Sequence, residues 1–173
     1  SHLVTLISDD ANDNPDNSID AGVYEPASIG DTVWYDSDQN GIFDGLDYPI
    51  DGTSGINSSI TVELTGDTDG DGSSETISST IDASGNYLFD GLFPGDYTLE
   101  FILPSGLTLT QQDVVGGGVE LDSDANPANG LTGVISVEAG EVDNSWDAGI
   151  YGAMSIGNYI WEDVNNSGDV DLD

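Results

Sequence analysis

Residues 36–47, DSDQNGIFDGLD, place oxygen-bearing side chains at regular intervals around one glycine. Counted as a twelve-residue loop, positions 1, 3, 5, 9 and 12 are Asp36, Asp38, Asn40, Asp44 and Asp47. This is the ligand spacing of an EF-hand calcium loop, in which Ile42 at position 7 would contribute its backbone carbonyl. Gly41 at position 6 permits the sharp bend that lets the odd positions converge. A merely solvated acidic turn has no reason to follow this spacing, so we predict a calcium site.

A second acidic segment, DTDGDGSSE at 67–75, joins two expected strands and repeats the spacing. Asp67, Asp69 and Asp71 stand at positions 1, 3 and 5, and Glu75 stands at position 9. Position 12 would be Ser78, which is a poor terminal ligand. Asp-Gly pairs also occur in plain hairpin turns, so a second calcium loop is favoured over a simple turn without excluding it.

A third candidate is ELDSDANPANG at 120–130, which offers Asp122, Asp124 and Asn126. Asp113 lies upstream of it. Three oxygens are too few for a calcium cage, so a distant side chain such as Asp31 or Asp147 would have to complete the site. A solvated polar loop explains the segment equally well.

An internal repeat sets the domain organisation. Residues 16–46 align without gaps with residues 143–173 at an offset of 127 residues. We therefore expect closing strands of a preceding repeat at 1–26, one complete domain at 27–151, and the truncated opening strand and calcium loop of the next repeat at 152–173. The copied loop keeps four ligand positions: Asp163, Asn165, Ser167 and Asp171. It stops one residue short of position 12, so it would bind calcium weakly or take a ligand from elsewhere.

Short alternating runs of apolar and polar residues predict an all-β fold. They lie at 58–64, 75–81, 85–92, 95–103 and 133–139 and are bounded by turn residues. Their spacing predicts an antiparallel β-sandwich. The segment before Asp36 also reads as a strand, so the EF-hand-like loop would be attached to a sheet edge instead of lying between two helices. Trp34 and Tyr35 are expected to cover the core, and a sugar-binding platform is the alternative.

The charge is entirely one-sided. The chain has 34 acidic residues, no lysine or arginine and one histidine, which gives a net charge of −34. Nucleic acid and anionic membrane surfaces are therefore excluded as partners. Disorder is the rival interpretation, but 36% of the residues are hydrophobic and lie in periodic runs. No cysteine is present and the lone histidine is His2, so neither disulfides nor a catalytic triad is expected.

Three segments together resemble the B-type domains of serine-aspartate-repeat surface adhesins, which are calcium-binding relatives of the collagen-adhesin B-type domain. They are SIGDTVWYDSDQNGIFDGLD, TIDASGNYLFDGLFPGDYTLEFILPSGL and LDSDANPANGLTGVISVEAGEVDNSWDAGIY. The resemblance implies an immunoglobulin-like (prealbumin-like) sandwich on a bacterial cell surface, with calcium bound by the loop at 36–47. Collagen-adhesin relatives often carry a Lys–Asn isopeptide bond, which a chain without lysine cannot form. Glu100, near the position of that family's catalytic acid, would have no lysine to serve.

The function expected from these observations is a calcium-stabilised stalk or spacer repeat, outside the cell and in contact with neighbouring repeats of the same protein. One alternative is a head-to-tail filament subunit, because residues 143–173 duplicate an earlier strand and would allow strand exchange. An arbitrary boundary in a long repeat protein explains the duplication more simply. A second alternative is a carbohydrate- or protein-binding adhesin module. An enzyme is not expected.

Overall fold

A computed structural model of the chain describes residues 23–50, 60–114, 118 and 121–152. The predicted loop copy at 163–171 lies outside these residues. So do residues 1–22 of the closing strands expected at 1–26, and the described remainder, residues 23–26, contains no strand. Within the described part, no helix is long and apolar enough to span a membrane.

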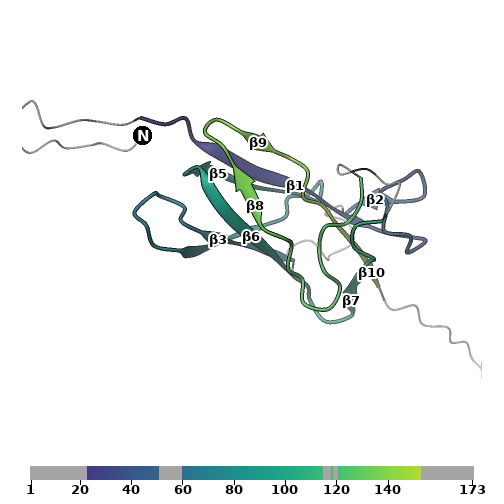
Figure 1. The fold of residues 1–173 in the computed structure, drawn as a ribbon. Helices are drawn as coiled ribbons and strands as arrows, with labels where there is room; N and C mark the ends of the chain where they lie inside the picture. Colours follow the sequence, from purple (N-terminus) through teal and green to yellow (C-terminus); the bar gives the residue numbers. More distant parts are fainter. Residues whose placement is uncertain (1–22, 51–59, 115–117, 119–120, 153–173) are drawn as a thin grey trace, which may run out of the picture.

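The described residues form two sheets that face each other across a common core (Figure 1). The strands are β1 (Ala27–Tyr35), β2 (Tyr48–Pro49), β3 (Thr61–Gly66), β4 (Glu75–Thr80), β5 (Asn86–Leu92), β6 (Gly95–Ile102), β7 (Leu107–Leu109), β8 (Ile135–Val137), β9 (Val142–Asp143) and β10 (Ala148–Gly152). One sheet has the order β2-β1-β10-β7, with β5 and β9 also paired to β1, and the other has the order β4-β3-β6-β8. The predicted all-β sandwich is confirmed.

Strand β1 organises the larger sheet. Its first half pairs with β5 and β9, and its second half pairs with β2 and β10. The pairings with β9 and β10 are parallel, whereas the other strand pairs are antiparallel. Parallel neighbours require a long crossover connection, and here nearly the whole domain lies between β1 and β10. The strand pairs of the sandwich are therefore antiparallel except where β9 and β10 pair with β1.

The core is formed by the buried side chains of strands in which inward-facing and outward-facing residues alternate. In β6 the side chains of Tyr97, Leu99 and Phe101 are buried, and those between them face outward. Buried side chains facing these come from the other sheet, in particular Ile29, Val33, Tyr87, Phe89 and Ile150. Burial of this apolar surface is the main stabilising term of the fold. The strands expected from alternation at 75–81, 85–92 and 95–103 correspond to β4, β5 and β6.

The two acidic loops lie at opposite ends of the sandwich (Figure 1). The loop at 67–75 connects β3 to β4 at the end where the chain leads into β1. The loop at 36–47 connects β1 to β2 at the end where β10 finishes. Each loop thus lies beside one of the two points at which a neighbouring repeat would be attached.

Candidate metal-binding loops

The loop at 36–47, which we call loop 1, is built around a buried carboxylate. Asp36 directly follows β1 and is 0% exposed. Its Oδ1 accepts hydrogen bonds from the backbone N–H groups of Gln39 (2.6 Å) and Asn40 (3.2 Å), and its Oδ2 accepts one from Gly41 (2.8 Å). The hydroxyl of Thr110 donates a further bond of 2.5 Å to Oδ2. These donors offset the cost of burying the charge and wrap the backbone around it.

The last residue of loop 1 closes it. Asp47 Oδ1 accepts a bond from the N–H of Ser37 (2.8 Å), at the second position, and its Oδ2 accepts one from the N–H of Asp44 (3.0 Å). Carboxylate oxygens of Asp36, Asp38 and Asp47 consequently lie within 4.8 Å of one another. Positions 1, 3 and 12 of the predicted loop therefore do converge.

The remaining predicted ligands of loop 1 lie around this group. The Asn40 side-chain amide donates to Asp38 Oδ2 (3.1 Å) and to Asp44 Oδ2 (3.3 Å), and its oxygen accepts from the N–H of Ile42 (2.7 Å). Asp44 is thus attached to the group through Asn40. Ile42 itself forms an isolated β-bridge with Asp122, which joins loop 1 to the third acidic segment.

The loop at 67–75, which we call loop 2, repeats the backbone of loop 1. Asp67 Oδ1 accepts bonds from the N–H groups of Gly70 (2.8 Å) and Asp71 (3.1 Å), and Oδ2 accepts one from Gly72 (2.9 Å). The three donors are at positions 4, 5 and 6, as they are in loop 1. The bond from the fifth N–H to the carboxylate at position 3, here Asp69 Oδ1 (3.1 Å), also recurs. Two independent segments have therefore folded into the same turn.

Glu75 closes loop 2 in the way that Asp47 closes loop 1. Its Oε2 accepts bonds from the N–H (2.9 Å) and hydroxyl (3.1 Å) of Thr68, which is the second residue of the loop. The expectation that Ser78 would be the terminal position does not describe the folded loop, because Ser78 lies on β4 and its hydroxyl donates to Glu63 (3.4 Å). The longer side chain of glutamate reaches the centre from position 9.

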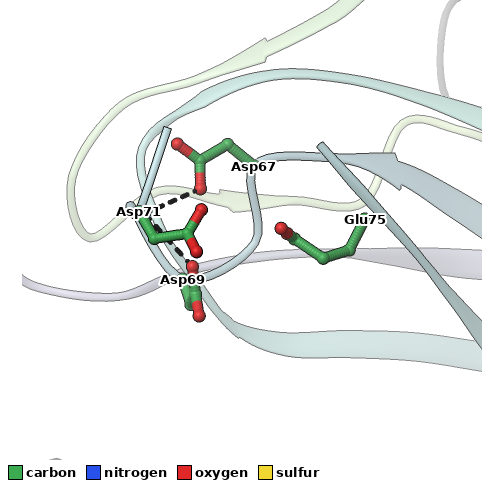
Figure 2. A group of neighbouring side chains, drawn as sticks. All are labelled: Asp67, Asp69, Asp71 and Glu75. Carbon is green, nitrogen blue, oxygen red and sulfur yellow. Dashed lines mark hydrogen bonds between the residues drawn. The ribbon is translucent and has the colours of Figure 1, made fainter. Parts of the chain in front are cut away.

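The four acidic side chains of loop 2 point toward one centre (Figure 2). One carboxylate oxygen from each of Asp67, Asp69, Asp71 and Glu75 lies within 4.8 Å of the others. Carboxylates held this close repel one another, and the chain has no lysine or arginine to neutralise them. A compact set of oxygen donors without nitrogen or sulfur fits a hard divalent cation such as Ca²⁺. The same donor chemistry is present in loop 1.

The third segment is organised differently. Asp124 Oδ2 accepts a bond from the N–H of Asp147 (2.7 Å), so the distant residue suggested by the sequence does lie beside it. Burial raises the pKa of Asp124 to about 7 and that of Asp147 to about 8, and nearby carboxylates, including Asp31 beside Asp147, add to both increases. The half-buried Asp124 and the buried Asp147 therefore form a site of unfavourable negative charge.

Two other members of this segment do not complete a cage. Asn126 uses its side-chain oxygen to accept a bond from the N–H of Ala128 (2.9 Å), within a turn. Asp122 is buried, and its Oδ1 has no hydrogen-bond partner. Burial also raises the pKa of Asp122. Among the described residues, only loops 1 and 2 bring three or more carboxylates within 4.8 Å of one another.

Trp34 is 0% exposed, as expected for a residue that covers apolar surface, and is not available as a sugar platform. Its indole lies against Gly149 of β10 and against Phe43 of loop 1, with ring centroids 5.5 Å apart. Tyr35 is half-buried and stacks on Tyr48, with ring centroids 5.2 Å apart. Sequence reasoning missed Phe43, although the one aromatic residue of the loop at 36–47 was a usable signal. It also missed Thr110, for which the sequence offered none.

Glu100 lies on the outward face of β6, between the buried Leu99 and Phe101. It stands directly opposite Glu63 on β3. Like charges placed opposite each other are destabilising, and without lysine in the chain neither glutamate has a cross-linking partner.

Comparison with known proteins gives a consistent set of similarities. The sequence profile of the SdrD B-like domain matches residues 27–150. Serine-aspartate repeat-containing protein F of Staphylococcus epidermidis is 38% identical over 159 residues, which cover 90% of this chain and 8% of that protein. Serine-aspartate repeat-containing protein D of Staphylococcus aureus (strain Newman) is 36% identical over 157 residues, or 89% of this chain and 11% of that protein. The chain thus spans about a tenth of the relatives it matches.

Among solved structures, the chain is similar to GBS52, the minor pilin of Streptococcus agalactiae, with a TM-score of 0.45 and 15% identity. That alignment covers 80% of this chain and 49% of the pilin.

Proposed function

Since the chain belongs to the SdrD B-like domain family, we propose that its sandwich is a calcium-stabilised spacer unit in the stalk of a bacterial cell-surface protein. The observation that carries this proposal is the shared geometry of loops 1 and 2. Both gather carboxylates around one centre with the same backbone hydrogen bonds, in a chain without basic residues. Neighbouring repeats of the same protein are the proposed partners.

The residues would hold the ion as follows. In loop 1, Asp36, Asp38 and Asp47 supply carboxylate oxygens, with Asn40, Asp44 and the carbonyl of Ile42 close by. In loop 2, Asp67, Asp69, Asp71 and Glu75 form the donor set. A bound Ca²⁺ supplies two positive charges at each centre. The chain's own contribution is a set of backbone N–H groups that orient the carboxylates of Asp36 and Asp67 in the closed loop, which lowers the cost of ordering each site when an ion binds.

The mechanical consequence follows from what the loops connect. Loop 1 ties the end of β1 to β2 and places Phe43 over Trp34, and loop 2 ties β3 to β4. Without a cation, repulsion between the carboxylates favours open loops and weakens these ties. Extracellular calcium modules bind with dissociation constants of about 10⁻⁴ to 10⁻³ M. Calcium at 100 times such a constant stabilises the folded state by about 2.7 kcal/mol per site.

Two such sites would contribute about 5 kcal/mol, a large share of the roughly 5–15 kcal/mol by which a domain is stable. A spacer that is stabilised by bound calcium becomes stiffer outside the cell, where calcium is plentiful. The lysine cross-link of the collagen-adhesin relatives cannot form in a chain without lysine, so bound ions would take its place in holding the sandwich together.

Thermal unfolding followed by circular dichroism, from chelator to millimolar calcium, tests the proposal. We expect a large calcium-dependent rise in melting temperature, reduced in the double variant Asp36→Ala/Asp38→Ala. Asp90→Ala/Glu138→Ala removes the same charge from exposed positions outside both loops and is expected to keep the full response. A melting temperature that is indifferent to calcium in the unmodified chain would refute the proposal.

A further inference from the structure

An aromatic ring from outside loop 2 packs against the backbone of this loop. The ring belongs to Phe93, in the turn between β5 and β6. A Cβ at Gly70 would lie 2.5 Å from the Phe93 ring, and Gly70 also has a φ of +79°. Only glycine allows this approach and this backbone conformation without strain. The position of the Phe93 ring is therefore fixed directly by the backbone of the acidic loop.

Two further contacts bind the turn to the loop. The N–H of Phe93 donates to the carbonyl of Thr68 (3.1 Å). The buried hydroxyl of Tyr97 lies within hydrogen-bond distance of the carbonyls of Asp67 (2.8 Å) and Phe93 (2.5 Å). Loop 2 and the Phe93 turn are consequently joined by hydrogen bonds, so a change in the conformation of the loop also moves the Phe93 ring.

The Phe93 ring also contacts Tyr24, from the segment that leads into β1. The two ring centroids are 4.8 Å apart and the planes meet at 73°, a favourable edge-to-face contact. The next residue is also anchored, because the carbonyl of Glu25 accepts a bond from the N–H of Gly140 (2.9 Å). Tyr24 remains 45% exposed, so the joint is open to solvent and not part of the core.

The internal repeat shows what Tyr24 represents. It ends the sequence DAGVY at 20–24, which corresponds at the offset of 127 residues to DAGIY at 147–151. In the described domain, Tyr151 belongs to the last strand, β10. Tyr24 is therefore the residue that the last strand of the preceding repeat would contribute, and it rests on a ring seated on the acidic loop of the following repeat.

We propose that Phe93, seated on Gly70, is a docking site for the closing tyrosine of the preceding repeat, and that cation binding in loop 2 controls this docking. Tyr151 presents the same group to the repeat that follows. The inference rests on the proposed calcium function and adds a partner and a contact to it. An occupied loop holds Gly70 in place beneath the ring, so the joint is closed. An empty loop opens by charge repulsion, and Phe93 loses the surface against which Tyr24 packs.

The test uses the full chain labelled with 3-fluorotyrosine and followed by fluorine NMR during a calcium titration. The resonance of Tyr24 is assigned by its loss in Tyr24→Phe, and that of Tyr48, beside loop 1, by its loss in Tyr48→Phe. We expect calcium to shift both resonances in the unmodified chain. Phe93→Ala should abolish the calcium-dependent shift at Tyr24 and leave the one at Tyr48 unchanged. The smaller change Phe93→Leu keeps the turn filled and should reduce the Tyr24 shift in the same selective way.

The outcomes separate the two proposals. Calcium-dependent melting with a Tyr24 resonance that does not move, or that moves equally in Phe93→Ala, would overturn the joint and leave the calcium function standing. A chain in which neither resonance nor the melting temperature responds to calcium would overturn both. A Tyr24 shift that disappears with Glu75→Gln but persists with Asp47→Asn would support control by loop 2 specifically.

Discussion

Single donors decide how well a buried carboxylate is tolerated, and Thr110 is the clearest case. Its side chain comes from beyond β7, 74 residues from Asp36 in sequence, and both residues are buried. Asp36 needs this donor most when no cation is present, because its negative charge is then offset only by hydrogen bonds. A residue outside the acidic loop therefore controls the stability of the empty loop.

Thr110→Val keeps the shape of the side chain and removes its donor. We expect a loss of about 1.5–3 kcal/mol in the free energy of unfolding in chelator, measured by urea unfolding, and a smaller loss in calcium. Thr65→Val removes a hydroxyl from an exposed pair with Thr76 and should cost less than about 0.5 kcal/mol. Equal losses at the two positions would show that Thr110 does not support Asp36.

The pair of Asp124, which is half-buried, and Asp147, which is buried, predicts an unusual pH dependence. Burial raises the pKa of Asp147 from 3.8 to about 8, so the folded state binds this proton more tightly than the unfolded chain does. Its stabilising effect is complete below pH 3.8 and is lost as the pH rises through about 8. In chelator, this group should therefore lower the melting temperature as the pH rises from 3.8 to about 8, and should have no further effect at higher pH.

Asp147→Asn removes this charge and should stabilise the chain at pH 9 by about 1–3 kcal/mol while flattening the pH profile. Asp82→Asn provides the contrast. Backbone hydrogen bonds from Asn86 and Ser84 lower the pKa of Asp82, so its charge is favourable in the folded state and its removal should destabilise. If both variants were stabilised equally, net charge alone would explain the result.

At the scale of elements, loop 2 brings its carboxylates together within nine residues, whereas loop 1 uses twelve. Glu75 both begins β4 and closes the loop on Thr68, so the strand itself positions the last carboxylate. A loop anchored on two paired strands needs no helices to hold its ends. Strands β3 and β4 pair from Thr61 to Gly66 and from Glu75 to Thr80, directly beneath it.

Glu75→Gln keeps the acceptor for Thr68 but removes a charge from the centre, and we expect calcium affinity at loop 2 to fall at least about 10-fold. Isothermal titration calorimetry would measure this as the loss or weakening of one class of sites. Ser78→Ala, at the position that a twelve-residue count would make terminal, should leave the titration unchanged. A larger effect from Ser78→Ala than from Glu75→Gln would contradict the role assigned here to Glu75.

Much of this architecture was predictable, because apolar and polar residues alternate clearly in strands such as β5 and β6, and this alternation indicates which face of the strand is buried. Strands β2, β7, β9 and β10 were not expected. The first three have only two or three residues and so show no period, and β10 buries Ala148, Gly149 and Ile150 in succession. The spacing of loop 1 predicted that Asp36, Asp38 and Asp47 converge, whereas Asp44 is attached to this group only through Asn40. The reach of Glu75 from position 9 depends on the turn conformation, which spacing alone does not determine.

At the scale of the whole molecule, a net charge of −34 with no basic residue opposes compaction everywhere, not only in the loops. Two effects of added salt must therefore be distinguished. Diffuse screening by monovalent ions reduces repulsion across the whole surface and requires concentrations at which the Debye length becomes short. Occupation of loops 1 and 2 neutralises particular carboxylates and requires only enough divalent cation to fill the sites.

Matched ionic strength separates these effects. Calcium chloride at about 1 mM and sodium chloride at about 3 mM have the same ionic strength and therefore screen surface charge equally. In both solutions the Debye length is far above 10 Å, so this screening is weak. With a dissociation constant of about 10⁻⁴ M, this calcium concentration fills about 90% of each site and adds about 1.4 kcal/mol per site. We therefore expect calcium to raise the melting temperature by roughly 5–15 °C, and sodium chloride to change it little. Sodium chloride near 0.5 M should recover only part of this gain, since screening does not place a cation between Asp67, Asp69 and Asp71. Equal shifts at equal ionic strength would mean that the loops are no different from the rest of an acidic surface.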